Sequence, residues 1–361
     1  MARRRERPTG DAARSLPVAV DAMGGDHAPG AVVAGARQVA DERGINVLLV
    51  GPEGAMGDTG GLPELHASEV IGMEDDPAQA VRRKKDSSLV RAAEAVRDGK
   101  ALAMVSAGNT GAAMAAALLR MGRLPGVIRP AIATPIPNPG TGRPPTVLLD
   151  AGANAECSAA MLVQFAQMGA AFARQRYEVS HPSVALLSIG EEKSKGTPLT
   201  KETHRLLAEG ALGEGATFVG NVEGRDFLHG VADVVVTDGF TGNVALKTLE
   251  GSLRFFIGAL AEILGRPSLT DAAQAVVAEL APLAAELDPE ATGGAMLLGL
   301  DGVCVISHGS SSPTAIVNAV TVAHDLAVAG LADAVADAVA PADGAAVPPG
   351  ARMPEVPAAG R

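Results

Sequence analysis

Short apolar runs alternate with longer amphipathic segments along most of the chain. The short runs are rich in Val, Leu and Ala and predict buried β-strands. They lie at residues 17–21, 45–50, 101–105, 146–149, 183–189, 233–236 and 303–306. The longer segments repeat apolar residues at helical spacing and predict helices. These lie at residues 29–43, 88–98, 109–121, 159–176, 198–210, 242–264, 270–287 and 313–339.

Strands that alternate with helices are typical of a sheet covered by helices on both faces. We therefore expect an α/β fold with a mostly parallel, doubly wound sheet, formed by residues 16–340. Residues 1–15 and 341–361 are rich in Pro, Gly, Ala and charge, and we expect both to be disordered tails, the first of them basic.

Two apolar helical patterns follow each other without a strand between them and predict a protruding helical hairpin at about 242–287. The break Gly265–Ser268 separates them. Core packing would explain one apolar stripe on each helix, but Phe255 and Ile263 extend the apolar surface beyond it. A hairpin packed in the core is one interpretation, and the other is that the surplus apolar face contacts a second subunit or a membrane surface.

Composition excludes several classes of protein. The chain of 361 residues is 47% hydrophobic but only 2% aromatic, with a formal net charge of −11. The negative charge and the shortage of stacking aromatics argue against a nucleic-acid partner. Two cysteines, Cys157 and Cys304, lie far apart, which suits a reduced cytoplasmic protein without disulfides or a zinc site. We expect neither a metal nor a cofactor.

The N-terminus is basic, but no apolar segment of a secretory signal follows it. No uninterrupted apolar run is long enough to span a bilayer. Both observations favour a cytoplasmic location.

A glycine-rich loop follows the first predicted strand. Asp21, Gly24, Gly25, Asp26 and His27 lie in this loop, and a proline suited to a first helical turn comes directly after it. A strand, a glycine-rich turn and a helix N-terminus together can hold an anion with backbone N–H groups. The loop is neither a dinucleotide fingerprint nor a P-loop. A tight turn capped by aspartate is the alternative.

Every other candidate also follows a predicted strand. Small and polar residues gather at these positions, and each set alone could be a capped turn, a solvated loop or a structural histidine. The candidates are Ser106, Asn109 and Thr110; Asn154; Lys195; Asp238, Asn243 and Lys247; and His308 and Ser310. Ligands of open α/β sheets bind at the carboxyl ends of the strands, so we expect these loops to converge on one pocket.

Several blocks resemble, in order, those of the bacterial phosphate acyltransferases known as PlsX. The blocks are V-D-A-M-G-G-D-H-A-P, V-R-R-K-K-D-S-S, S-A-G-N-T-G, L-D-A-G-A-N, V-T-D-G-F-T-G-N-V-x-L-K-T-L-E-G and H-G-S-S, and the resemblance spans residues 17–330. It implies a fold like that of phosphotransacetylases and isocitrate-type dehydrogenases. It also implies transfer of a fatty acyl group from acyl carrier protein to inorganic phosphate for phospholipid synthesis.

The resemblance further implies a homodimer, contact of the hairpin with the inner face of the membrane, and a product used by a membrane-bound glycerol-3-phosphate acyltransferase. The basic run Arg82–Lys85 alone could be a solvated face, but since acyl carrier protein is acidic, the resemblance implies a docking or phosphate-facing patch. Lys84 and Lys85 belong to this run.

The chemistry implied is direct attack of phosphate on the thioester, through one tetrahedral intermediate and without an acyl-enzyme. We expect Asn109, Thr110 and Asn243 to donate to the oxyanion. Lys195 and Lys247 would hold phosphate, and His308 would donate to phosphate or protonate the leaving thiolate. Asp21, Asp26 and Asp238 would orient these donors. The other expected substrate-binding residues are Gly24, Gly25, His27, Lys84, Lys85, Ser106, Asn154 and Ser310.

Three other functions fit less well. A phosphotransacetylase-like enzyme would use the same chemistry on short acyl-CoA. A scaffold without catalysis would not need the full set of polar loops, and a nicotinamide dehydrogenase would need a G-x-G-x-x-G that follows no strand here. Cys157 could form a thioester, but no histidine lies near it in sequence.

Overall fold

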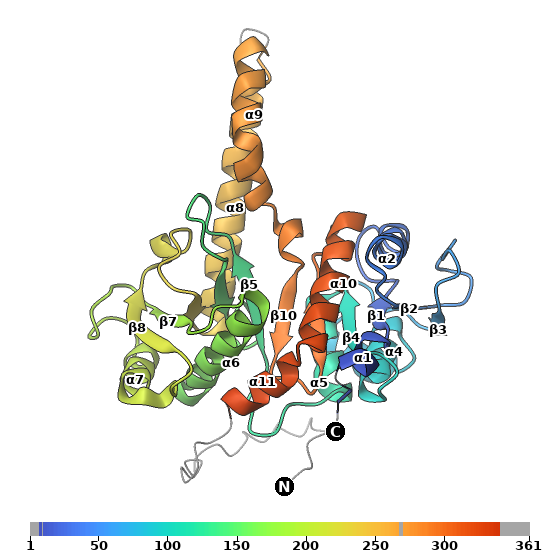
Figure 1. Ribbon diagram of the computed structural model, residues 1–361, viewed down its shortest axis with the longest axis horizontal. Coiled ribbons are helices and arrows are strands. Elements are labelled where there is room, and N and C mark those ends of the chain that lie inside the picture. The colour runs from blue at the N-terminus through green and yellow to red at the C-terminus, as the bar shows by residue number, and fades with distance from the viewer. Residues whose placement is uncertain (1–6, 9, 267–269, 340–361) are drawn as a thin grey trace, which may run out of the picture.

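Eleven strands form one sheet in the part of the chain that the computed structural model describes, namely residues 7–8, 10–266 and 270–339 (Figure 1). The order across the sheet is β3-β2-β1-β4-β11-β10-β5-β6-β9-β7-β8. The strands are β1 Val18–Asp21, β2 Val47–Gly51, β3 Glu64–His66, β4 Ala103–Ser106, β5 Ala131–Ile136, β6 Thr146–Leu149, β7 Ser183–Leu187, β8 Thr217–Val222, β9 Val234–Val236, β10 Ala295–Leu298 and β11 Val303–Ile306.

Helices cover both faces of this sheet. They are α1 Gly10–Arg14, α2 Gly30–Arg43, α3 Pro77–Arg83, α4 Ser88–Arg97, α5 Thr110–Arg120, α6 Ala159–Tyr177, α7 Pro198–Leu206, α8 Gly239–Leu264, α9 Thr270–Glu286, α10 Pro313–Val328 and α11 Leu331–Ala338. Buried residues of α2, α6, α10 and α11 form the core on one face. Buried residues of α3, α4 and α5 form the core on the opposite face. Partly buried residues from the first turns of α8 pack against this second core. The predicted α/β fold with a mostly parallel sheet is confirmed.

The strands do not all run in one direction. β3, β2, β1, β4 and β11 are mutually parallel, and so are β6, β9, β7 and β8. Between the two groups, β10 runs antiparallel to β11 and to β5, and β5 runs antiparallel to β6. The two parallel groups therefore end at opposite edges of the sheet. The expectation that all candidate loops lie at one edge is wrong for this reason.

Four strands, β3, β5, β8 and β10, were not predicted from the apolar pattern, and neither were helices α1 and α3. The segment predicted as one helix at 313–339 is two helices, α10 and α11, because Gly330 has a left-handed φ of 76° between them. Helix α1 lies within the predicted N-terminal tail. Residues 341–361, predicted to be the second tail, lie outside the described residues.

The helices α8 and α9 form the protruding hairpin that the pattern predicts (Figure 1). Three consecutive apolar side chains of α8 are exposed beyond the sheet, with Phe255 at 78%, Phe256 at 67% and Ile257 at 53%. Among the described helices none alone is long and apolar enough to cross a membrane, although α10 and α11, bent by 59°, pass that test as a pair.

Candidate functional site

Asp21 is the buried centre of the β4 cluster, our name for the polar residues that follow β1, β4 and β11. Its carboxylate accepts a hydrogen bond of 2.7 Å from Ser106 Oγ and one of 3.3 Å from the N–H of Met23. Burial raises the pKa of Asp21, while hydrogen bonds from Ser88 and Ser106 act in the opposite direction. Asp21 and Ser106 thus hold segments together rather than face solvent.

Glycines let the opening loop lie directly on the turns beside it. A Cβ atom on Gly24 would stand 2.7 Å from the backbone nitrogen of Gly108, and one on Gly25 would stand 3.0 Å from the carbonyl oxygen of Gly309. The N–H of Asp26 donates to that same oxygen at 2.7 Å. The loops after β1, β4 and β11 are therefore in contact, as the ends of neighbouring parallel strands should be.

His308 is exposed on the turn after β11. Its Nδ1 accepts a hydrogen bond of 3.2 Å from the N–H of Ser310 and lies 2.8 Å from the hydroxyl of Ser310. Because Nδ1 acts as an acceptor, the proton of the neutral ring lies on Nε2. Within the described residues no hydrogen bond engages Nε2, or the exposed side chains of Asp26 and His27. The β4 cluster can therefore offer these groups to a ligand.

The side chain of Asn109 is already fully engaged. Its amide donates to the carbonyl oxygens of Met73 at 2.9 Å and Asp75 at 3.2 Å, and its oxygen accepts from the N–H of Ala112 at the start of α5. It therefore fixes the segment before α3 against the turn after β4. Thr110, the next residue, is exposed on the first turn of α5.

Lys84 is also used within the protein. Its ammonium lies 2.5 Å from the carboxylate of Asp75 and donates to the carbonyl oxygen of Val70 at 2.8 Å. Lys85 is exposed. The structure thus places Lys84 beside the Asn109 turn as a structural ion pair and leaves Lys85 on the surface.

Asp150 is the corresponding centre of a second group, the β9 cluster, which comprises the polar residues after β6, β9 and β7. Its buried carboxylate accepts hydrogen bonds from four backbone N–H groups and from the side-chain amide of Asn154. That amide also donates to the carbonyl oxygen of Pro130 at 2.8 Å. Asp150 and Asn154 thus build the turn rather than face a substrate.

The first turn of α8 rests on this turn. A Cβ atom on Gly242 would stand 1.9 Å from the carbonyl oxygen of Asp150, so only glycine fits. Asn243 is exposed, and its side-chain oxygen lies 3.3 Å from the position of a Cβ on Gly152. Asp238 caps the helix by accepting from the N–H and the hydroxyl of Thr241, each at 2.8 Å. The amide of Asn243 has no hydrogen-bond partner in the described part of the chain.

Two lysines belong to the same edge of the sheet. Lys195 is exposed on the loop after β7, and its ammonium pairs with no acidic group among the described residues. Lys247, one turn beyond Asn243 on α8, forms an exposed ion pair of 2.8 Å with Glu250. Because β7 pairs with β9, the loop of Lys195 neighbours the start of α8.

Cys157 also lies near this turn, with its sulfur 3.6 Å from the carbonyl oxygen of Asn154. Burial raises the pKa of the Cys157 thiol to about 12, and the nearby carboxylates of Asp150 and Asp238 add to the effect. The thiol is therefore protonated at neutral pH and is a poor nucleophile.

The β4 and β9 clusters do not meet within one chain. No hydrogen bond or ion pair joins them among the described residues. Three strand spacings of about 4.8 Å each, roughly 14 Å in all, separate β11 from β6. In addition, the loops after β11 and β6 lie at opposite edges of the sheet. The expectation that all candidate residues share one pocket within a single chain is therefore wrong. Within the described residues, no group of His, Cys, Asp and Glu could hold a metal.

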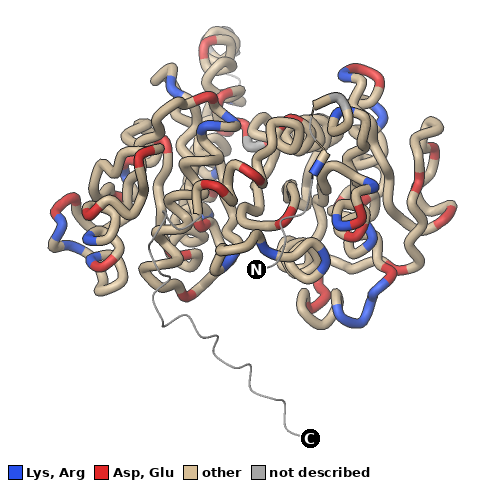
Figure 2. Tube along the Cα trace, turned by 60° about the horizontal axis from the view of Figure 1, so that its bottom comes forward, with Lys and Arg blue, Asp and Glu red and all other residues tan. Residues whose placement is uncertain are grey.

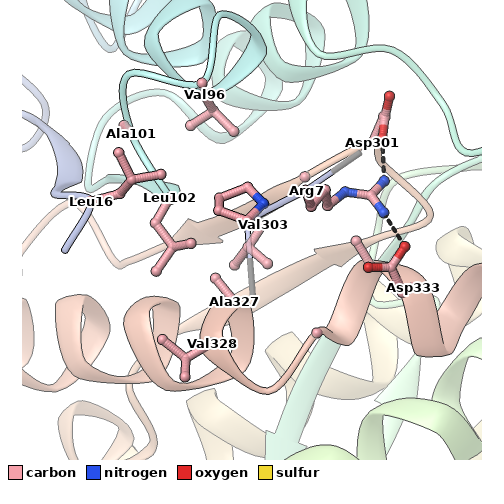
Figure 3. Close-up of a pocket in the computed structure, with 15 residues that line it drawn as sticks. Arg7, Leu16, Val96, Ala101, Leu102, Asp301, Val303, Ala327, Val328 and Asp333 are labelled. Carbon is pink, nitrogen blue, oxygen red and sulfur yellow. Dashed lines mark hydrogen bonds and ion pairs between the residues drawn. The ribbon is translucent and has the colours of Figure 1, made fainter. Parts of the chain in front are cut away.

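A small pocket lies elsewhere, at the amino ends of β1, β4 and β11 (Figure 3). Arg7 reaches across it from the N-terminal segment and forms ion pairs with Asp301 and Asp333. Apolar side chains such as Leu102 and Val303 form much of the rest of its wall. This pocket contains none of the predicted site residues, and the two ion pairs fix Arg7 in it.

Met73 and Asp75 were not identified from the sequence as site-building residues, and Asp150 was noted only as the acid of the block L-D-A-G-A-N, without a role. Asp150 carries a usable signal, since it follows a strand and precedes the small residues Ala151 and Gly152, just as Asp21 precedes Ala22 and Gly24. Met73 and Asp75 act through their backbone carbonyl oxygens, which leave no signal in residue type.

Comparison with known proteins agrees with the blocks noted in the sequence. Residues 16–334 match a family described as fatty acid synthesis protein. The phosphate acyltransferase of Anaeromyxobacter sp. (strain Fw109-5) is 47% identical over 341 residues, which cover 91% of this chain and 92% of that protein. The phosphate acyltransferase of Myxococcus xanthus (strain DK1622) is 49% identical over 324 residues, which cover 86% and 90%.

A solved structure supports the fold. A phosphotransacetylase from Streptococcus pyogenes superposes with a TM-score of 0.60 at 16% identity, and the match covers 87% of this chain and 94% of that one. The predicted likeness to phosphotransacetylases in fold is thereby confirmed.

Proposed function

This chain belongs to the phosphate acyltransferase family, and from that premise we propose that it transfers a fatty acyl group from acyl-[acyl carrier protein] to inorganic phosphate. The product, an acyl phosphate, would supply phospholipid synthesis. The observation that supports the proposal is the identity of nearly half the residues, over about nine tenths of the chain, to a protein named phosphate acyltransferase.

Phosphate itself is the nucleophile in this reaction. One of its oxygens attacks the thioester carbonyl, the carbonyl oxygen becomes an oxyanion, and the C–S bond then breaks to release the thiolate of the carrier. Phosphate is anionic at neutral pH, whereas the thiol of Cys157 has a pKa of about 12 and is not. This contrast favours direct attack without an acyl-enzyme.

The β9 cluster supplies the donors to the carbonyl and to phosphate. The amide of Asn243 donates to the oxyanion, and the ammonium of Lys195 binds phosphate as a point charge. Both side chains are exposed and uncommitted, which supports these roles. Lys247 binds phosphate as well. Its exposed ion pair with Glu250 is weak, so the ammonium can leave Glu250 when phosphate is present. Asp238 orients the start of α8 through its cap.

The β4 cluster supplies a hydrogen-bond donor. His308 donates a hydrogen bond from Nε2 to phosphate or to the leaving thiolate, while Nδ1 accepts from the N–H of Ser310. Asp26, His27 and Thr110 flank it on the neighbouring turns. Asn109 acts as a positioning residue instead of an oxyanion donor, because its amide already holds two carbonyl groups.

We assign the two clusters to one site that forms between the subunits of a homodimer. In each chain the clusters face opposite edges of the sheet, so that a site containing both needs a second copy. Helix α8 belongs both to the site and to the proposed dimer contact. It carries Asn243 in its first turn and the exposed residues Phe255–Ile257 farther along. Burial of those side chains against the partner's hairpin would stabilise such a dimer.

The remaining partners follow from the proposed reaction. The acyl donor is acyl carrier protein, and the product passes to a membrane-bound glycerol-3-phosphate acyltransferase. We propose a cytoplasmic enzyme that touches the inner face of the membrane through the hairpin of α8 and α9.

The test is an assay of the purified protein with long-chain acyl-[acyl carrier protein] and phosphate. We expect an acyl phosphate, trapped as its hydroxamate, to accumulate only when phosphate is present. Activity with acetyl-CoA but not with the carrier-bound donor would favour a short-chain phosphotransacetylase. Absence of phosphate-dependent thioester cleavage with either donor would leave a scaffold role.

A further inference from the structure

Three basic side chains near the end of α3 are exposed and unneutralised. Arg82 and Arg83 lie in the last turn of the helix, and Lys85 follows it. None of the three forms an ion pair within the described residues. Together with Lys84 they make one unbroken basic stretch of chain, coloured blue in Figure 2.

The carboxylates next to this stretch already have other partners. Asp75 accepts from the ammonium of Lys84 and from the N–H of Gly72 at 2.8 Å. Asp86 accepts from the hydroxyl and the N–H of Ser68, at 2.7 and 2.9 Å. The three cations are therefore not compensated locally, although the whole chain carries a formal charge of −11.

Elsewhere on the surface, many cations are paired within the chain. Arg37 pairs with Asp58, and Arg205 pairs with both Glu202 and Glu209. The macrodipole of α3 favours cations in its last turn, but it does not account for Lys85, which lies beyond the helix. This local excess of positive charge is available to bind an external anion.

This stretch is fixed to the β4 cluster. Lys84 holds Asp75, and the amide of Asn109 holds the carbonyl of the same residue. Helix α3 also packs closely on α5, because a Cβ on Gly111 would stand only 2.7 Å from Pro77 Cγ. A partner bound to Arg82, Arg83 and Lys85 is therefore held at a defined place beside the turn of Asn109.

We propose that Arg82, Arg83 and Lys85 form the docking surface for the acidic protein that carries the acyl thioester. This inference rests on the proposed function and adds where the donor binds. Long, exposed side chains at a helix end suit the spread charges of a protein surface better than a single phosphate ion, which needs converging donors. An anionic membrane fits less well, since α3 exposes no large apolar side chain that could enter a lipid surface.

The test compares two triple variants that change the charge equally. The first is Arg82→Glu, Arg83→Glu and Lys85→Glu. The matched control is Arg14→Glu, Lys100→Glu and Lys201→Glu, at exposed and scattered positions. For the first variant we expect the KM for acyl carrier protein thioester to rise about tenfold or more at low salt, with kcat nearly unchanged. Activity with the small donor acyl-CoA should stay within about twofold.

A second variant, Arg82→Lys with Arg83→Lys, keeps the charge and should retain the KM of the unmodified protein. The docking surface is excluded if the first triple variant lowers activity equally with acyl carrier protein thioester and with acyl-CoA. It is also excluded if the control triple variant raises the KM for acyl carrier protein thioester as much. Loss of binding to phosphatidylglycerol vesicles with an unchanged KM would assign the patch to membrane instead. If the unmodified protein turns over neither donor, the proposed function itself fails, whereas a normal KM in the triple variant rejects only the docking surface.

Discussion

The carbonyl oxygen of Asp150 lies 1.9 Å from the position that a Cβ atom on Gly242 would occupy. No other pair in the β9 cluster leaves so little room. The contact seats the first turn of α8 on the turn after β6, and it thereby sets the position of Asn243.

Gly242→Ala should therefore damage the site more than the fold. The added methyl group must push α8 away, which typically costs about 1–3 kcal/mol of unfolding free energy. A displacement of about 1 Å at Asn243 is enough to lower kcat by roughly a hundredfold. Acyl phosphate formation and thermal melts measure the two effects. Gly224→Ala, at an open position, serves as the control and should change neither.

The apolar pattern misses the two edge strands, β3 and β8, and two central strands, β5 and β10. Strands β1, β4, β6 and β9 are short apolar runs and were recognised. Strand β5 contains Pro135, which argues against a central strand. The structure accommodates this proline because pairing with β10 stops at Ala133, so that Pro135 faces no ladder on that side.

The missed strands explain the wrong expectation about the site. Both β5 and β10 run antiparallel to their neighbours, and they reverse the direction of the sheet between the two parallel groups. Without them, every strand end falls at one edge. Residue types alone identified Asn243 and His308 as candidates, but only the strand directions show that the two leave opposite edges.

Asp21 should make the stability of the protein depend on pH. Its pKa is raised in the folded state by burial, so the folded protein binds this proton more tightly than the unfolded chain does. The stabilisation is complete below the unfolded pKa of about 3.9 and is lost as the pH rises through the folded pKa.

Asp21→Asn removes that proton equilibrium. The unfolding free energy of the variant, relative to the unmodified protein, should therefore increase as the pH rises from about 4. Thermal melts from acid to neutral pH measure the difference. A relative stability that falls with rising pH would contradict a raised pKa for Asp21.

Cys157 should be dispensable for catalysis. With a pKa of about 12, its thiol is almost fully protonated at pH 7 to 9 and should react slowly with iodoacetamide. We expect Cys157→Ala to keep kcat within about threefold, because direct attack by phosphate needs no enzyme nucleophile. Mass spectrometry of protein quenched during turnover should find no acyl adduct. An acylated Cys157 peptide would refute direct attack.

Arg7 should stabilise the fold without affecting the chemistry. Its side chain is only 16% exposed and pairs with Asp301 and Asp333 in the pocket at the amino ends of β1, β4 and β11, which contains no predicted site residue (Figure 3). Arg7→Ala leaves two carboxylates close together and should lower the unfolding free energy by about 1–3 kcal/mol. Arg37→Ala, which breaks an exposed pair with Asp58, should cost less than about 1 kcal/mol. If both variants lose the same unfolding free energy, the ion pairs of Arg7 stabilise the fold no more than an exposed surface pair does.

Mixed dimers decide whether the site is shared between subunits. Asn243→Ala disables the β9 cluster and His308→Ala disables the β4 cluster, so each homodimer should be nearly inactive. If each site takes one cluster from each subunit, a mixed dimer contains one site with both defects and one site with none. Random assembly of equal amounts should then restore about one quarter of the unmodified activity, and a purified mixed dimer about one half. A site contained in one chain would give no recovery, because every subunit carries a defect. Refolding the two variants together, with each variant refolded alone as the control, separates these outcomes in one measurement.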